Sequence, residues 1–205
     1  VLFDQCPGGA MAAAVKALAE CPPEMGFSYP CNAGWRLWAL AKAGRADAIL
    51  SDLRGRWAEM ESVKLNLTLQ EGWHARPDGT AQWSHCPLAP LYVTVQDLAG
   101  IRPLEPGYRR MQVRPQLGDL PDLEVVAHTP PGPVRFRAVR EGSGHRVEVT
   151  VPAGCEAELV LPSGAPCALA PLGDGVLPGL RRHRLLPGVT NAFAVPAAPV
   201  PPADP

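Results

Sequence analysis

The hydrophobic period of this chain changes near residue 105. Before that point apolar residues recur at helical spacing, most clearly over residues 46–60, where Ala46, Leu50, Leu53, Trp57 and Met60 share one face. After it, apolar and polar residues alternate, as in His-Arg-Val-Glu-Val-Thr-Val at residues 145–151. Helices and strands distribute their side chains with different periods. The chain is therefore expected to fold as a helical part, residues 1–104, followed by a β part, residues 105–196.

Composition changes at the same place. All five tryptophans lie in the first 83 residues, whereas 18 of the 25 prolines follow position 100. So sharp a change is typical of a domain boundary. A third part, residues 197–205, is rich in proline and alanine. It cannot bury apolar surface and is expected to be a disordered tail.

Four helices are expected in the first part. Their apolar patterns cover residues 11–19, a segment through Trp35 to Lys42, residues 46–60 and residues 87–99. Short connections without an intervening strand are typical of antiparallel helical hairpins.

The second part shows strand patterns at residues 111–115, 134–139, 145–151 and 191–195. Proline- and glycine-rich turn signals separate them at spacings of about 8–12 residues, which predicts an antiparallel β-sandwich.

Charge and cysteine usage exclude several classes of protein. The net charge is −1 and evenly spread, so no basic stripe for nucleic acid is present. No apolar run approaches the roughly 18 residues of a membrane span. The six cysteines have no metal-site or disulfide spacing, which favours free thiols in a reducing compartment such as the cytoplasm. The chain starts Val-Leu-Phe-Asp, without an initiator Met or a signal pattern, and is expected to be part of a longer protein.

Candidate functional residues gather in the connection between the third and fourth helices. Glu71, Trp73, His74, Trp83 and His85 all lie there, and connections held by a rigid scaffold often carry function. Glycoside hydrolysis requires two carboxyl groups, and aromatic faces hold the sugar ring. Glu71 would be one of that pair, and the two tryptophans would be platforms. The histidines would hydrogen-bond sugar hydroxyls or orient a carboxylate.

Simpler interpretations of these residues remain open. Glu71 could be a solvated loop glutamate, the tryptophans could fill the core, and His85 could cap or fill the start of the fourth helix. The spacing of Glu71, His74 and His85 matches no metal pattern, so neither a metal nor a cofactor is expected.

Four motifs resemble one known family. T-L-Q-E-G-W, W-S-H-C-P-L-A-P-L-Y, L-A-G-I-R-P-L-E-P-G-Y and V-R-P-Q-L-G-D-L resemble the closing section of bacterial α-L-rhamnosidases, glycoside hydrolase family 78. The resemblance covers roughly residues 25–165. It implies the last helical hairpins of an (α/α)6 barrel, followed by a C-terminal β-sandwich.

The resemblance also implies roles for individual residues. Glu71 matches the general base of an inverting mechanism, and His85 matches a histidine of the sugar subsite. The general acid would lie upstream, outside these residues, so the chain alone is expected to be inactive without the upstream part of the same barrel. The implied substrates are glycosides or oligosaccharides with terminal α-L-rhamnose. Gln70 and Pro87 stand where the family usually has tryptophan.

Two alternatives keep parts of this interpretation. Another (α/α)6-barrel glycosidase, of α-L-fucosidase type, would retain Glu71 as base with a different sugar. A non-catalytic carbohydrate-binding or architectural protein would retain the fold without the activity.

Overall fold

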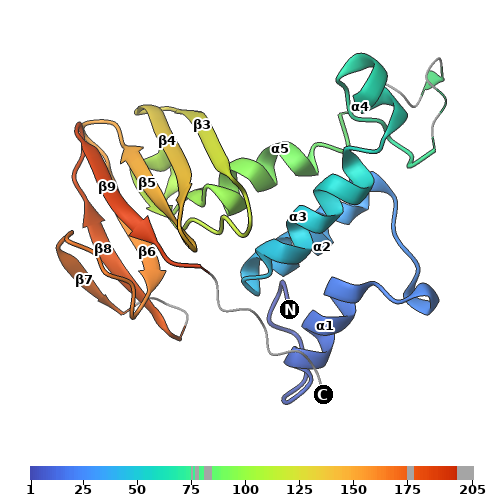
Figure 1. Cartoon of the computed structure of the whole chain (residues 1–205), viewed down its shortest axis with the longest axis horizontal. Helices are drawn as coiled ribbons and strands as arrows, with labels where there is room; N and C mark the ends of the chain where they lie inside the picture. Colours follow the sequence, from blue (N-terminus) through green and yellow to red (C-terminus); the bar gives the residue numbers. More distant parts are fainter. Residues whose placement is uncertain (75, 77–78, 81–84, 175–177, 198–205) are drawn as a thin grey trace. The chain divides into compact units, whose positions relative to one another are not determined.

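The computed structural model describes residues 1–74, 76, 79–80, 85–174 and 178–197. The chain divides into two compact units, Val1–Thr94 and Val95–Pro205 (Figure 1). The division expected between residues 104 and 105 lies inside the second unit, because Ile101–Pro103 forms a strand of its sheet. The expected tail, residues 197–205, lies outside the described residues except at its first position.

The first unit is helical. Its elements are α1 (Met11–Glu20), a short 3₁₀ turn (Pro23–Met25), α2 (Pro30–Lys42), α3 (Ala46–Asp52) with its π-helical continuation (Leu53–Trp57), α4 (Glu61–Asn66) and α5 (Ala89–Val93). A second π-helical turn, Thr94–Leu98, continues α5 into the other unit. The four expected helices are confirmed, whereas α4 was not expected. It has only six residues, which is too short for an apolar period to be recognised.

The second unit contains two β-sheets. One has the strand order β1 (Ile101–Pro103), β2 (Arg110–Val113), β6 (Glu156–Pro162), β8 (Leu180–Leu185) and β7 (Pro171–Asp174). The other has the order β3 (Asp122–Thr129), β4 (Gly132–Glu141), β5 (Gly144–Thr150) and β9 (Thr190–Val195).

One strand pair departs from the expected antiparallel arrangement. β2 and β6 are parallel, with Arg110 opposite Glu156, while the other pairs are antiparallel. The three strands between β2 and β6 in sequence belong to the other sheet. The chain therefore crosses over before it returns, and a crossover connection permits parallel pairing.

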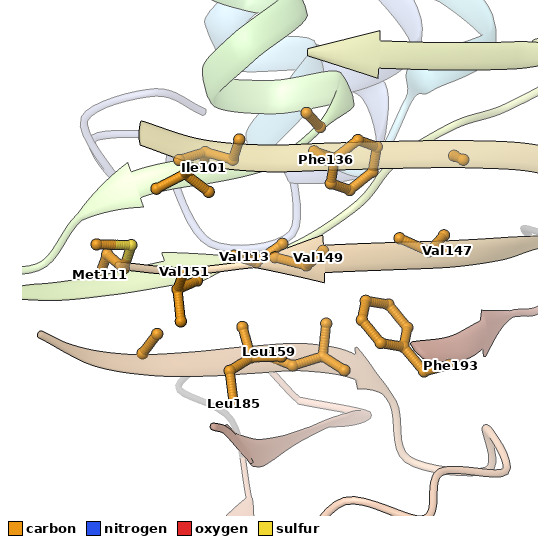
Figure 2. Close-up of a cluster of buried hydrophobic side chains, with 14 of the residues drawn as sticks. Ile101, Met111, Val113, Phe136, Val147, Val149, Val151, Leu159, Leu185 and Phe193 are labelled. Carbon is orange, nitrogen blue, oxygen red and sulfur yellow. The ribbon is translucent and has the colours of Figure 1, made fainter. Parts of the chain in front are cut away.

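The inner faces of the two sheets form one hydrophobic core (Figure 2). On β4 the buried side chains are Val134, Phe136 and Ala138, and the residues between them point outward. Met111, Leu159 and other residues of the five-stranded sheet complete the cluster. The alternation expected from the sequence is thus confirmed in the packing of the sandwich.

A buried carboxylate lies where the second unit begins. The Asp97 side chain is fully buried and pairs with Arg102, whose Nε also donates to the Gln96 carbonyl at 2.9 Å. Burial raises the pKa of Asp97, and the attraction of the Arg102 cation opposes this only in part. The fold therefore favours the protonated acid relative to the unfolded chain.

The stability of the second unit is expected to depend on pH through this group. Because the pKa of Asp97 is raised on folding, its contribution to stability is present below the ordinary pKa of about 4 and is lost as pH rises through the raised value. The free energy of unfolding of the natural chain, relative to Asp97→Asn, should therefore fall between about pH 4 and pH 7. Urea titrations of both chains at the two pH values measure this difference. A relative gain in stability with rising pH would mean that Arg102 outweighs burial.

Candidate functional site

The segment after α4 folds back onto the start of that helix. Leu67 ends α4 in a left-handed conformation, with φ of 56°. The Ser62 hydroxyl then donates to the Thr68 carbonyl at 2.8 Å, and the Thr68 amide donates to the Ser62 carbonyl at 3.3 Å. These bonds place residues 68–73 against the first turn of α4.

The side-chain amide of Gln70 holds the next three residues. Gln70 is 1% exposed, and its Oε1 accepts a hydrogen bond from the Ser62 backbone N–H at 3.0 Å. Its Nε2 donates to the carbonyls of Gly72 at 2.8 Å and of Trp73 at 3.2 Å. The turn from Gln70 to Trp73 is therefore closed by side-chain hydrogen bonds.

Trp73 anchors the far end of this turn. Its indole Nε1 donates to the Ser28 carbonyl at 2.8 Å. Its ring centroid lies 5.3 Å from that of Phe27 and 5.1 Å from that of Trp57, the latter edge to face. Such aromatic pairs stabilise by about 0.5–1.5 kcal/mol beyond their buried area. Trp73 is thus a packing residue in the structure, and its role as a sugar platform stays a prediction.

A buried charge cluster lies beside these rings. Arg36 pairs with Asp52, and both side chains are largely buried. Arg56 lies 3.5 Å from the same carboxylate, and its guanidinium stands over the Phe27 ring at 3.8 Å. Burial lowers the pKa of Arg36, yet the guanidinium remains a cation at neutral pH.

Nothing in the local sequence indicates this cluster. Arg36 and Asp52 lie on different helices and belong to no local motif. Arg36 also donates to the carbonyls of Leu18 at 2.6 Å and Ala19 at 3.1 Å, near the end of α1. The cluster thereby links α1, α2 and α3, and it contacts Phe27, on which Trp73 packs.

Glu71 itself is exposed. No described residue donates a hydrogen bond to its carboxylate or forms an ion pair with it. Water can therefore reach the Glu71 carboxylate, and its role as general base stays a prediction.

The other predicted site residues are less closely tied to this turn. His74 and His85 are both exposed. Within the described part of the chain, no hydrogen bond or ion pair joins either histidine to Glu71. Trp83 lies outside the described residues. The grouping of these residues around one sugar stays a prediction.

The described ranges show neither a metal-binding cluster nor a membrane-spanning helix. They contain no group of three or more His, Cys, Asp or Glu side chains that could hold a metal ion. No helix among them is long and apolar enough to cross a membrane. The six cysteines, all within the described residues, form no disulfide bond.

A family model matches the second unit. Residues 100–169 match the bacterial alpha-L-rhamnosidase C-terminal domain. This match begins at Gly100, directly before β1, and extends past β6. No curated protein matches the chain.

Several solved α-L-rhamnosidases have a similar fold. The enzyme from Aspergillus terreus aligns with a TM-score of 0.70 over 94% of this chain at 22% identity. The family GH78 rhamnosidase of Bacillus sp. GL1 aligns with a TM-score of 0.63 over 77% at 24% identity. The Streptomyces avermitilis enzyme, complexed with L-rhamnose, aligns with a TM-score of 0.52 over 90% at 19% identity.

At these identities the likeness is one of fold. The chain spans 23%, 18% and 21% of the lengths of those three structures, in the order given. Together with the family model, they confirm the resemblance to bacterial α-L-rhamnosidases that the sequence motifs predicted.

Proposed function

We propose that this chain is the C-terminal part of an inverting glycoside hydrolase that releases terminal α-L-rhamnose from glycosides or oligosaccharides. The match of residues 100–169 to the rhamnosidase C-terminal domain is the observation that carries the proposal. The fold shared with three α-L-rhamnosidases over both units supports it.

Glu71 is the proposed general base. In an inverting mechanism the base removes a proton from water, which attacks the anomeric carbon while a general acid protonates the leaving oxygen. The two carboxyl groups stand about 6.5–9.5 Å apart to admit that water. The exposed carboxylate of Glu71, on a turn held by Gln70 and Trp73, supports this role.

The sugar would be held by side chains near the base. His85 is proposed to donate to a sugar hydroxyl, and His74 to act in the same way. Trp73 and Trp83 are proposed to face the apolar side of the ring. The changes at Gln70 and Pro87, relative to the resembled motifs, would alter this aromatic surface.

The general acid is proposed to lie in an upstream part of the same barrel. Exposed apolar side chains in the first unit support further helices that would pack on it. Phe3, Trp35 and Leu91 are each more than half exposed, and α1 contains no buried residue. Exposed apolar patches of this kind mark contact surfaces. Without the upstream part of the barrel and its general acid, the chain alone is expected to be inactive.

A substrate screen of the complete enzyme tests the proposal. Aryl α-L-rhamnoside and aryl α-L-fucoside are assayed in parallel, and NMR follows the anomer released first. We expect cleavage of the rhamnoside with inversion, so that the β-anomer appears before mutarotation. Retention would exclude the proposed role of Glu71. Cleavage of the fucoside alone would keep the architecture and change the sugar. Binding without cleavage would favour a non-catalytic carbohydrate-binding protein.

A further inference from the structure

Gln70 directly precedes the proposed base, and its side-chain amide is fully used inside the protein. A glutamine side chain offers one oxygen acceptor and two N–H donors. The oxygen accepts the Ser62 N–H, and the nitrogen donates to the Gly72 and Trp73 carbonyls. At 1% exposure, every lost bond would leave a buried polar group without a partner.

The bond to Ser62 replaces a missing helix cap. The first N–H groups of a helix have no partner within it and usually bond a capping side chain. The N-cap of α4 is Met60, which makes no such bond. Gln70, eight residues beyond Ser62 in sequence, supplies the acceptor instead. The turn is thereby attached to the start of α4.

The other two bonds bracket Glu71. They run from the side chain before it to the two carbonyls after it, so the backbone of Glu71 lies inside a hydrogen-bonded ring. Since no described residue bonds the Glu71 carboxylate, the backbone is the part of its position that the described residues fix. A tryptophan, usual at this place in the resembled motif, has one donor and no acceptor and could not make these contacts.

We infer that Gln70 is a positioning residue for the base: its amide holds the Glu71 backbone so that the carboxylate meets the attacking water. The inference rests on the proposed function, since it needs Glu71 to act as base. A misplacement of about 1 Å can lower a rate by roughly 10²-fold, which sets the scale of the expected effect.

Two substitutions in the complete enzyme test this role. Gln70→Met keeps the length of the side chain and removes all three hydrogen bonds. Gln70→Glu keeps an acceptor for Ser62 and removes both donors. Each is expected to lower kcat on aryl α-L-rhamnoside by about 10–100-fold with little change in KM. Turnover is expressed per rhamnose-binding site, counted by calorimetry, so that unfolded protein does not count as lost activity.

Hydrogen exchange separates positioning from general damage. Exchange at the Ser62 amide should accelerate in Gln70→Met and stay slow in Gln70→Glu, because only the second variant keeps the acceptor.

Gln112→Met serves as the matched control. It removes a glutamine hydrogen bond to Glu158 in the sandwich, of 3.0 Å, and should leave kcat unchanged. Full kcat in both Gln70 variants, with Ser62 exchange accelerated in Gln70→Met, would overturn the inference. Should Gln70→Met not fold, full kcat in Gln70→Glu alone would overturn it. Full turnover in Glu71→Gln would instead refute the base assignment, so the two failures are distinguishable.

Discussion

Replacing Glu71 by glutamine in the complete enzyme is expected to lower kcat by about 10²–10⁴-fold, the range that positioned acid–base groups contribute. Glutamine has nearly the same shape as glutamate but cannot take a proton from water at neutral pH. The Glu71 carboxylate makes no hydrogen bond with a described residue, so its replacement should leave the turn held by Gln70 intact. The Kd for L-rhamnose should therefore change little.

Steady-state kinetics and calorimetry check this expectation. Glu61→Gln is the matched control, because Glu61 is also exposed and lies on neighbouring α4. Its turnover should equal that of the natural enzyme. Natural turnover in Glu71→Gln would remove Glu71 from the mechanism, and loss of rhamnose binding would assign it to substrate binding instead.

The second large effect is expected at Gly100, between the helical turn Thr94–Leu98 and β1. Its φ is +77°, a conformation that costs other residues free energy. A Cβ atom there would lie 2.0 Å from the Arg114 carbonyl oxygen and 2.5 Å from the Arg114 nitrogen. The Gly100 carbonyl also accepts the Arg114 N–H at 3.0 Å, so backbone would have to move. Gly100→Ala should lower the free energy of unfolding by about 3–5 kcal/mol.

Gly107 provides a control with almost the same backbone conformation. Its φ is +73°, but no heavy atom lies within 4 Å of the site of its Cβ. Gly107→Ala should therefore lower the free energy of unfolding by only about 1–2 kcal/mol, the effect of the left-handed backbone conformation alone. Urea unfolding followed by far-UV circular dichroism measures both variants. Equal losses would show that the contact with Arg114 adds nothing.

Much of the fold was predictable from local pattern. The helical stripe of residues 46–60 and the alternation in residues 134–139 each depend on burying one face of one element, which is a property of neighbouring residues. Both patterns correspond to elements of the structure. The parallel pairing of β2 with β6 was not predictable in this way, because it depends on which sheet receives the three strands between them.

The candidate site was likewise predictable only in its local part. Glu71 and its neighbours were identifiable because a motif is a local string of residues. The partners of that string were not, since Trp73 packs on Phe27 and bonds Ser28, 45 residues away in sequence. The burial of Gln70 was not predictable either, because a polar residue in a loop belongs to no periodic apolar pattern.

The sequence by itself determined that a helical part precedes a β part and which faces of the strands point inward. It also identified the segment around Glu71 as the candidate site. Only the tertiary structure decided how that segment is held. The Gln70 amide meets its one donor and its two acceptors, and the Trp73 ring packs on Phe27 and Trp57, only once α4 and the preceding helices are packed. The reason is physical: periodicity reports which faces are buried, whereas hydrogen-bond and ring partners depend on the distances that chain folding creates.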